Sequence, residues 1–443
     1  MEDTEAIIAF VEQLISTQTR KSLSFIQKVI LQDSLSEEKR TYSQIAKNNN
    51  YSEDYLKKVV APSLWKLLSE VLGEKVNKSN CRALLKQRLE STDFLTIETP
   101  TETVNTISLE NPEGQVPLIS PWYVERPPLE VNCYQAIMEP SALIRIKAPR
   151  KMGKTSLMTR ILAYGEKQNY HTVRLSLHRA ETNIFTSVEK FMRWLCANVT
   201  RQVGLESKLD KYWDEDMGAL VSSSIYFQGY ILKEIEEPII LALDEINQLF
   251  DYPTIVQDFM ALLRSWHEET KDIGLWRKLR LIIVHSTDVY ISLPTNQSPF
   301  NVGFAIDLPP FNKSQVEDLA NRHGLKLTSL ELEQVIELIG GFPYLVRLAF
   351  YHCVENGIPL QNLLRDAVTN TSIFYKHLNY LMWKLEQNHE LKEAFRQVLV
   401  GESRLDTEIF FKLYSLGLIS LSANGVRVSC GLYEDYFSKL LIV

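Results

Sequence analysis

The pattern of apolar and polar positions divides the chain into three regions. Residues 1 to about 90 are rich in helix-forming residues and contain no glycine before Gly73, so we expect helices there. From about residue 116 to 310, short runs of apolar and β-branched residues alternate with stretches of helical pattern. Such runs predict strands of a parallel sheet that helices cover on both faces. The predicted strands are 142–147, 172–177, 239–243 and 279–285.

The third region, from about Asn312 to the C-terminus, returns to a helical pattern. The segment LISLSANGVRVS interrupts it near the end, and its Asn424-Gly425 pair suits the tight turn of a hairpin. Between the first two regions, residues 93–115 are rich in Thr, Ser, Asn and Glu and contain proline breakers, which predicts a linker. The helices expected in the third region include 373–386, 391–400 and 407–416.

A Gly-Lys-Thr sequence follows the first predicted strand. In ALIRIKAPRKMGKTSLMTRIL, the strand leads through a turn into an amphipathic helix that begins at Gly153, Lys154 and Thr155. The N–H groups of such a helix attract phosphate, the lysine reaches the β- and γ-phosphates, and the threonine holds Mg²⁺. The full motif has a glycine where this chain has Ala148, but the strand and the helix lie where the motif requires them. The predicted nucleotide-binding residues of this loop also include Arg150, Met152 and Ser156.

A second motif, IILALDEIN, is an apolar strand that ends in Asp244 and Glu245. In P-loop ATPases an aspartate at this point acts on Mg²⁺ through its water shell, and the following glutamate polarises the attacking water. The pair lies about 90 residues after the Gly-Lys-Thr sequence with a predicted strand between them, as the motif requires. We therefore predict metal contacts from Thr155 and Asp244 and a catalytic role for Glu245, which favours hydrolysis over binding alone.

Two further segments extend the candidate site. LRLIIVHSTDVY is a buried strand with a polar end, and we expect Ser286 and Thr287 to act as a polar sensor beside the γ-phosphate. A strand end capped by hydroxyl groups is the alternative, and His285 is interpreted as a core histidine. In IGGFPYLVRLAFYH, two glycines precede Pro343 and predict a sharp turn into a helix.

Composition and charge narrow the class of protein. The chain has 443 residues, of which 45% are hydrophobic and 23% charged, which is typical of a globular protein with buried cores. Its net charge of -7 argues against wholesale binding to nucleic acid. The five cysteines form no CxxC pair, no apolar run reaches the ~20 residues of a membrane span, and the N-terminus lacks a basic signal-peptide region. We therefore expect a cytoplasmic protein without a membrane segment.

The N-terminal region holds a candidate helix-turn-helix. Thr41 or Ser43 is expected to start a short helix, and residues 48–51 to form the turn. Ser52 is expected to cap a second helix, which Pro62 interrupts. These features predict an all-α module of the kind that binds DNA or a protein partner.

The charges of this module leave both partners open. Residues 39–88 hold 11 Lys or Arg and 4 Asp or Glu, a balance of +7 in a chain whose net charge is -7. A basic balance favours DNA because it neutralises phosphates. The second helix nevertheless opens with Glu53 and Asp54, which would face bases or phosphates, and this favours a protein partner.

The ordered set of motifs resembles a bacterial AAA-like family of the STAND and archaeal-ATPase branch. The resemblance spans about residues 116–443 and rests on RKMGKT, LALDE, VHST, SPFNVG with LPPF, and GGFPYLV. It implies that the ligand is ATP with Mg²⁺, and no guanine-specific Asn-Lys-x-Asp motif is present. It also implies a helical lid in which Pro343 lines the base pocket. Arg347 would then be a second sensor, with a surface arginine as the alternative.

The resemblance leaves the arginine finger and the partner unassigned. Some relatives carry an arginine after the SPxxxG stretch, where this chain has Phe304. The N-terminal module resembles adaptors that precede ATPase domains in bacterial conflict systems, which favours a protein partner. The arginines that could replace the finger are Arg264, Arg277 and Arg280.

These inferences predict an α/β protein with a parallel-sheet P-loop core, a helical lid and a C-terminal winged-helix-like unit, preceded by an all-α helix-turn-helix domain. The expected parts are the N-terminal domain (1–92), the linker (93–115), the ATPase core (116–311), the lid (312–370) and the winged-helix-like domain (371–443).

The resemblance implies an ATP-binding switch with low turnover that signals to a protein partner through its N-terminal module. The alternative is a DNA-associated ATPase, such as a transcription regulator or a helper in transposition or replication. A homo-oligomer that depends on the bound nucleotide is left open by the same resemblance.

Overall fold

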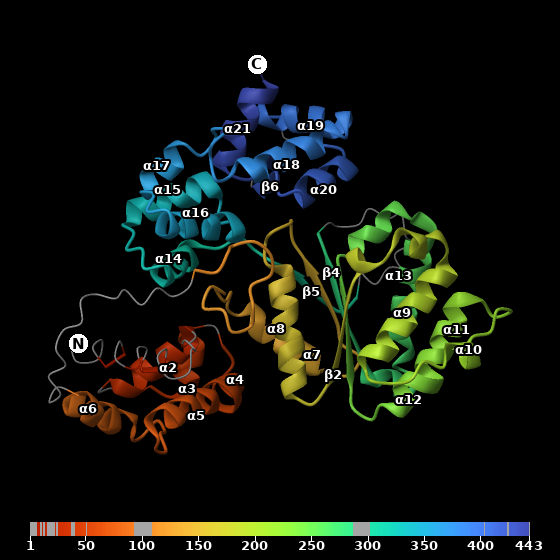
Figure 1. Ribbon diagram of the computed structural model, residues 1–443, viewed down its shortest axis with the longest axis horizontal. Helices are drawn as coiled ribbons and strands as arrows, with labels where there is room; N and C mark the ends of the chain where they lie inside the picture. The colour runs from red at the N-terminus through yellow and green to blue at the C-terminus, as the bar shows by residue number, and fades with distance from the viewer. Residues whose placement is uncertain are drawn as a thin grey trace. The chain divides into compact units, whose positions relative to one another are not determined.

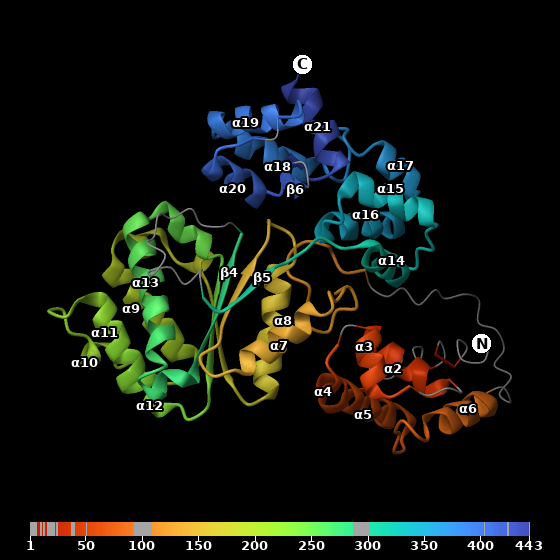
Figure 2. The same ribbon diagram turned by 180° about the vertical axis from the view of Figure 1, so that it is seen from behind.

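The computed structural model describes residues 7–8, 11, 14–15, 23, 25–36, 40–49, 51–92, 109–286, 302–402, 404–422 and 425–442. The chain divides into two compact units. Unit 1 consists of Met1–Glu110 and Ile119–Asn132, and unit 2 of Asn111–Leu118 and Cys133–Val443. Figures 1 and 2 show the elements of each unit from opposite sides.

The N-terminal part of unit 1 is built from helices around an apolar core. Its helices include α2 (Phe25–Leu35), α3 (Tyr42–Asn48), α4 (Glu53–Tyr55), α5 (Ala61–Leu72) and α6 (Cys81–Thr92). A capping box starts α3: the Thr41 hydroxyl accepts from the N–H of Gln44, and the Gln44 side chain accepts from the N–H of Thr41. The Ser52 hydroxyl accepts from the N–H of Tyr55 and caps α4. Thr41 is therefore the correct choice between the two predicted helix starts, and the predicted Ser52 cap is confirmed.

The prediction that Pro62 interrupts the second helix is wrong. Helical backbone continues from α4 through Leu56–Val60 into α5, and Pro62 lies in the first turn of α5. Leu56–Val60 has the wider winding of a π-helix, in which the N–H of Ala61 bonds to the Leu56 carbonyl. A wider turn gives a proline ring room beside the preceding carbonyls, and proline has no N–H to satisfy. The helix-turn-helix therefore has one long second helix.

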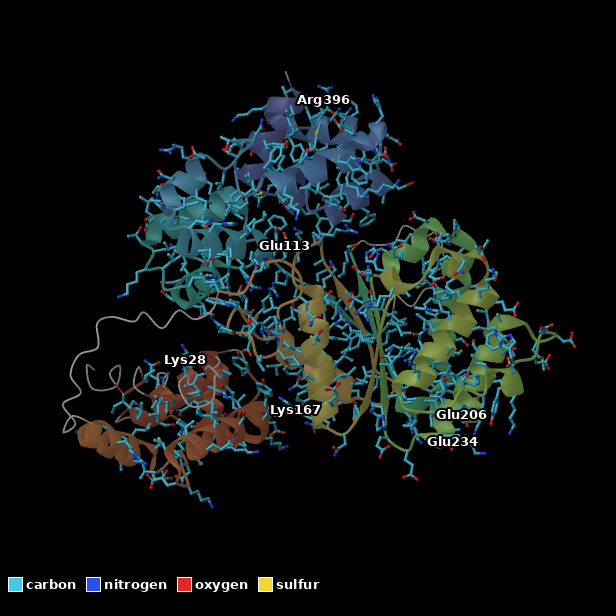
Figure 3. The ribbon with its side chains drawn as sticks, in the orientation of Figure 1. Lys28, Glu113, Lys167, Glu206, Glu234 and Arg396 are labelled. Carbon is cyan, nitrogen blue, oxygen red and sulfur yellow. The ribbon has the colours of Figure 1, made fainter. Side chains whose placement is uncertain are left out.

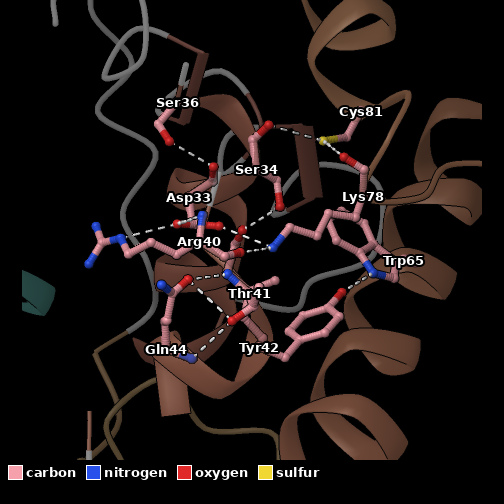
Figure 4. A network of polar contacts seen from close by, with 11 residues as sticks. Asp33, Ser34, Ser36, Arg40, Thr41, Tyr42, Gln44, Trp65, Lys78 and Cys81 are labelled. Carbon is pink, nitrogen blue, oxygen red and sulfur yellow. Dashed lines mark hydrogen bonds and ion pairs between the residues drawn. The ribbon is translucent and has the colours of Figure 1, made fainter. Parts of the chain in front are cut away.

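Asp33 forms a buried ionic cluster inside unit 1 (Figure 4). Its side chain is 2% exposed and pairs with Arg40 (Nε to Oδ1, 3.3 Å) and Lys78 (Nζ to Oδ2, 3.1 Å). The Lys78 ammonium also donates to the Arg40 carbonyl at 2.6 Å and lies over the ring of Tyr42. These residues come from α2, the start of α3 and the turn before α6, so one carboxylate holds three segments together.

The sheet of unit 2 has five parallel strands in the order β2-β3-β4-β1-β5. Four of them match the predicted strands to within one residue at each end, because β3 and β4 are buried along their whole length and read as continuous apolar runs. The fifth was not predicted, since only Ile306 of its four residues is buried. The strands are β1 (Leu143–Lys147), β2 (His171–Ser176), β3 (Ile239–Asp244), β4 (Leu279–His285) and β5 (Phe304–Asp307).

Helices cover both faces of this sheet (Figures 1 and 2). On the α8 face, Gly165 lies so close to Ile240 that a Cβ at this position would meet its side chain. On the opposite face, Leu241 and Leu243 share one apolar cluster with residues of α9 and α13. The helices between residues 129 and 269 are α7 (Leu129–Met138), α8 (Lys154–Lys167), α9 (Val188–Gln202), α10 (Leu209–Tyr212), α11 (Gly218–Tyr226), α12 (Leu232–Glu234) and α13 (Pro253–Glu269).

The C-terminal part of unit 2 is a helical lid and a winged-helix-like unit. β6 (Ile419–Ser422) pairs antiparallel with β7 (Gly425–Val428), which confirms the predicted hairpin, although Asn424 of its turn lies outside the described residues. The three helices predicted in this region end within two residues of α18, α19 and α20. The helices are α14 (Lys313–Arg322), α15 (Ser329–Ile339), α16 (Pro343–Glu355), α17 (Leu360–Arg365), α18 (Tyr375–Glu386), α19 (His389–Leu399), α20 (Thr407–Ser415) and α21 (Gly431–Leu441).

The predicted sharp turn between α15 and α16 depends on two glycines. Gly340 and Gly341 have φ angles of 69° and 71°, in the left-handed region that L side chains disfavour. The Gly341 carbonyl accepts a hydrogen bond from the N–H of Phe311 at 2.8 Å. A Cβ at position 341 would collide with the Phe311 carbonyl oxygen, so the close approach of these two backbones requires glycine.

We expect Gly341→Ala to lower the free energy of unfolding by about 3 kcal/mol or more, because it adds a backbone collision to the cost of a left-handed alanine. Gly324→Ala is the matched control, since Gly324 has a φ of 74° and open space around its Cβ position. The control should lose only the left-handed penalty of about 1–2 kcal/mol. Urea unfolding followed by tryptophan fluorescence measures both, and equal losses would show that the contact with Phe311 does not matter.

We expect Asp33→Ala to destabilise unit 1 by about 3 kcal/mol, because it leaves Lys78 partly buried without its carboxylate. Asp54→Ala is the control: Asp54 also pairs with a lysine, Lys58, but its side chain is 73% exposed, so little change is expected. Hydrogen exchange in the full chain reads out the stability of α2 and α3 directly. Asp33→Asn, which preserves size, serves if the alanine variant does not fold, and unchanged exchange in both would contradict a stabilising role.

Candidate nucleotide-binding site

The loop between β1 and α8 has the backbone conformation of a phosphate-binding loop. Lys151 and Gly153 both adopt positive φ angles, 64° and 93°. Gly153 is the N-cap of α8 and provides no side-chain hydrogen bond to the N–H groups of the first helical turn. Uncapped N–H groups at the start of a helix, together with its dipole, form a binding place for anions. Met152, a predicted loop residue, is buried and fixes the loop to the core.

Lys154 is folded onto the loop itself. Its Nζ donates to the carbonyl oxygens of Ala148 and Pro149, both at 2.8 Å. Burial lowers the pKa of Lys154 to about 7, against an opposing effect of the Asp244 carboxylate. Ala148, which replaces the first glycine of the motif, is buried. Its carbonyl oxygen accepts the hydrogen bond from Lys154 although the residue is not a glycine.

Asp244 lies at the end of β3 beside Thr155. The Thr155 hydroxyl donates to Asp244 Oδ2 at 3.2 Å, so the two predicted metal contacts are adjacent. The Asp244 residue is 3% exposed, and its burial raises the pKa of the carboxyl group. Arg174, on β2, also lies 3.2 Å from Oδ2 through its Nη2. One buried carboxylate oxygen thus accepts from a hydroxyl and a guanidinium.

Glu245 follows in a left-handed conformation, with φ 60°. Ser176, the last residue of β2, and His178, in the turn after it, hold the Glu245 carboxylate. The Ser176 hydroxyl donates to Oε2 at 3.0 Å, and His178 Nε2 lies 3.2 Å from Oε1. The other ring nitrogen of His178 is 2.6 Å from the side-chain amide of Gln248. The glutamate predicted to be catalytic is therefore held in a network of polar side chains.

Three of these partners, Arg174, Ser176 and His178, were not predicted. A signal for Ser176 and His178 was present, because the parallel pairing of β2 with β3 places Ser176 opposite Asp244. The polar residues after β2 must then lie at the same edge of the sheet as those after β3. Arg174 gave no such signal, since an arginine within a strand is usually a solvated side chain.

The predicted sensor residues are only partly described. Ser286 directly follows β4 and is 9% exposed. Its hydroxyl donates at 3.2 Å to the side-chain oxygen of Asn247, in the turn that follows Glu245. His285 is 3% exposed, in accordance with a core histidine. Thr287 lies outside the described residues.

The start of α16 adjoins the phosphate loop. Pro343 occupies the first turn of α16, and the next residue, Tyr344, lies under the Lys151 ammonium at 3.5 Å from its ring centroid. Arg347, one turn later, is 5% exposed and donates to the carbonyl of Asn111 at 3.4 Å. The alternative of a surface arginine at 347 is therefore wrong, because the side chain is buried against the segment that enters the core.

The segment Asn111–Leu118 crosses this region and bonds to several parts of it. The N–H of Val116 donates to the Ser156 hydroxyl at 3.0 Å, and Gln115 Oε1 accepts from Arg174 at 2.8 Å. Glu113 accepts from the Tyr344 hydroxyl at 2.7 Å. Residues 111–115, which their composition assigned to the linker, thus belong to the unit that carries the sheet.

Three other arginines that the sequence suggested for the site bond to other parts of unit 2. Arg150 is exposed and donates to the Tyr380 hydroxyl of α18 at 2.5 Å. Arg280, one of the proposed replacements for the finger, is 4% exposed and donates to the backbone carbonyls of Ile137 and Lys278. Arg264 bonds to Glu268 of its own helix. Burial removes Arg280 from the candidates for a finger that reaches another molecule.

A cleft of about 1430 Å³ lies beside the phosphate loop. Pro149 and Met152 form one side of it, and the lid and the winged-helix-like unit form the other, through Phe342, Tyr414 and Val428 among others. Neither Lys154 nor Asp244 lines it. We therefore locate the candidate nucleotide site by its side chains rather than by this cleft.

The fold is that of a P-loop NTPase. It combines a parallel sheet, a phosphate loop that ends in a glycine at the edge of the sheet, and a buried aspartate beside the loop threonine. Comparison with known families agrees. The model of the AAA-like domain matches residues 111–439, so the chain belongs to the AAA-like domain family. Residues 2–88 match the N-terminal HTH of vWA-MoxR associated proteins, in agreement with the helix-turn-helix of unit 1.

The chain is similar to several solved structures at low sequence identity. A Walker-type ATPase of Pyrococcus abyssi is 13% identical, with a TM-score of 0.50 over 71% of this chain and 96% of that chain. The ORC2 protein of Aeropyrum pernix, solved as ADPNP–ADP complexes, is 16% identical, with a TM-score of 0.40 over 71% and 92%. The ORC1 protein of the same organism, solved with DNA, is 13% identical, with a TM-score of 0.35 over 72% and 94%. No curated protein matches the chain.

Within the described residues, no helix combines the length and the apolar character that crossing a membrane requires.

Proposed function

We propose that the chain is an ATP-binding switch that hydrolyses ATP slowly and passes its nucleotide state to a partner through the N-terminal module. The observation that carries this proposal is the meeting of four groups at one sheet edge: the Lys154 ammonium, the Thr155 hydroxyl and the carboxylates of Asp244 and Glu245. Membership in the AAA-like domain family supports nucleotide binding.

The residues present fit a magnesium nucleotide. Gly153 leaves the helix N–H groups of α8 uncapped, and the partly buried Lys154 donates its hydrogen bonds to two backbone carbonyls. Oxygen donors, here Thr155 and Asp244, are the ligands that Mg²⁺ prefers. Bound ATP supplies a γ-phosphoryl group that water attacks, with Mg²⁺ neutralising charge on its oxygens.

Each residue then has a role within this proposal. Lys154 leaves the loop carbonyls and binds the β- and γ-phosphates, while Thr155 and Asp244 hold the metal. Glu245 orients the attacking water and takes its proton, and Ser286 contacts the γ-phosphate side of the site together with Thr287. Pro343 lines the base pocket and Arg347 acts as the second sensor. The remaining loop residues, Arg150, Met152 and Ser156, shape the phosphate loop.

The contacts of the lid support a switch rather than a simple hydrolase. Tyr344 touches Lys151 of the phosphate loop and Glu113 of the entering segment. Arg347 binds the backbone of that same segment. A change of contacts at the phosphate loop therefore reaches the lid through neighbouring side chains, which is how a local event biases a larger movement. We extend the proposal to a nucleotide-dependent assembly in the cytoplasm.

We expect Lys154→Ala to weaken ATP binding at least ~100-fold, and Glu245→Gln to keep binding while turnover falls by about 10²-fold or more. The controls are Lys167→Ala, at the far end of the same helix, and Glu234→Gln on α12; both are exposed and labelled in Figure 3. Equilibrium binding of a fluorescent ATP analogue, phosphate release and particle mass are followed in the same samples.

A larger particle trapped by Glu245→Gln with ATP would support the assembly. Equal binding by the wild type, Lys154→Ala and Lys167→Ala would overturn the nucleotide site. Binding without phosphate release in the wild type would leave a nucleotide-locked scaffold in place of the slow ATPase.

We propose a protein partner for the N-terminal module, in the manner of an adaptor in a bacterial conflict system of the STAND kind. The first turn of the second helix supports this. Lys57 and Lys58, its leading cations, pair with Glu53 and Asp54 one turn earlier, at 2.5 Å and 2.8 Å. Cations that are neutralised within their own helix are less able to replace the counterions of DNA.

We therefore expect the full chain to bind a mixed-sequence duplex no more tightly than about 10 µM at 50 mM salt, as in weak non-specific binding. Fluorescence anisotropy across a salt series measures this, with a Lys57→Ala, Lys58→Ala double variant as the control. Tight binding that falls steeply with salt and is weakened in the double variant would establish the DNA-associated ATPase instead.

A further inference from the structure

Arg174 occupies a position that the roles assigned above do not explain. It lies on β2, where the strand register places it opposite Ala242 of β3, two residues before Asp244. Its side chain reaches the edge of the sheet and is 37% exposed, whereas the side chain of Asp244 is 4% exposed. An arginine in a strand usually extends into solvent. Here the guanidinium turns towards a buried carboxylate.

The guanidinium forms two defined contacts. Nη2 lies 3.2 Å from Asp244 Oδ2, and Nη1 donates to Gln115 Oε1 at 2.8 Å. Oδ2 is also the atom that accepts from the Thr155 hydroxyl. Arg174 therefore binds the oxygen of Asp244 that faces the loop threonine, and this is the oxygen pair assigned to the metal in the proposed function.

Two cations beside Asp244 Oδ2 repel each other, which costs electrostatic free energy. A divalent ion beside Asp244 and Thr155 would lie within a few ångströms of the guanidinium, in a partly buried place where screening is weak. The pair between Arg174 and Asp244 and the binding of a metal at Asp244 therefore oppose each other.

We propose that Arg174 is the counter-ion of Asp244 in the nucleotide-free chain and that binding of Mg²⁺ with ATP has to displace it, together with its partner Gln115. This inference rests on the proposed nucleotide site. It assigns to Arg174 a positioning role, because the residue acts by setting how readily Asp244 accepts the metal.

The displacement has a consequence for the entering segment. Gln115 is part of Asn111–Leu118, which is continuous in sequence with unit 1 at both ends, at Glu110 and at Ile119. The same segment is bonded to the phosphate-loop helix through Val116 and Ser156. Loss of the bond between Gln115 and Arg174 releases one of these attachments. The metal step of nucleotide binding is thereby coupled to the chain segment that leads to the N-terminal module.

The test is the Mg²⁺ dependence of ATP binding in the full chain. Binding of a fluorescent ATP analogue is titrated with Mg²⁺ for the wild type and for Arg174→Gln, and repeated in EDTA. We expect the half-saturating Mg²⁺ concentration of Arg174→Gln to fall about tenfold, a coupling of ordinary size, with affinity in EDTA unchanged. Arg174→Lys, which keeps the charge, should remain near the wild type.

Two further variants serve as controls for this interpretation. Arg193→Gln removes an arginine that also pairs with an aspartate, but the side chain of that partner, Asp210, is 91% exposed, so no change is expected. Gln115→Leu keeps the ion pair and removes the second anchor of the guanidinium, and should lower the Mg²⁺ requirement by a smaller factor. It also serves if Arg174→Gln does not fold, as judged by thermal unfolding.

The outcomes separate this inference from the proposed function. An unchanged or raised Mg²⁺ requirement in both Arg174→Gln and Gln115→Leu would overturn the counter-ion role. Weaker binding of Arg174→Gln in EDTA would also overturn it, because Arg174 would then be a phosphate ligand. A wild type that binds no ATP at any Mg²⁺ concentration would instead contradict the nucleotide site itself.

Discussion

The parallel pairing of β3 with β2 and β4 fixes the position of Asp244, and the candidate site is arranged around this buried carboxylate. β3 is buried from end to end, so its last side chain reaches a place with little water. A carboxylate there is costly unless hydrogen bonds and an opposite charge compensate it. The Thr155 hydroxyl donates a hydrogen bond to Asp244 Oδ2, and the Arg174 guanidinium provides the opposite charge, each at 3.2 Å from this oxygen. The chain then turns through a left-handed Glu245, which brings the second carboxylate to Ser176 and His178.

Each charged group of the site has a partner within the protein when no ligand is bound. Lys154 uses the carbonyls of its own loop, Asp244 uses Arg174, and Glu245 uses the end of β2. Under the proposed function, nucleotide binding is an exchange of partners, so its net free energy is smaller than the new contacts alone would give. This arrangement is consistent with the proposed switch, because a ligand shifts an equilibrium only by the difference between its affinities for the two states.

The sequence predicted the elements whose pattern of apolar residues indicates that they are buried. β3 and β4 were predicted because they are buried along their whole length, and β1 and β2 because buried apolar residues alternate with polar ones at one or both ends. β5 was missed because it is an edge strand with one buried residue, Ile306. The motif residues of the loop and of β3 could be proposed from the sequence because the chemistry of phosphate and metal binding fixes their spacing. Arg174 could not be found in this way, because its contact with Asp244 depends on the strand register. Pro62 was misjudged since a π-helical turn, which composition does not encode, accommodates it.

Within the segment Asn111–Leu118, residues 111–115 looked like a linker for a related reason: they are polar and include two breakers, and the order of the segment comes from bonds that other elements supply. Ser156 of α8, Arg174 of β2 and Arg347 of α16 each bind one of its residues. These three elements carry the phosphate loop, the strand beside Asp244 and the start of the lid. Under the proposed function, each changes its contacts when nucleotide binds. A segment held by all three responds to their combined state.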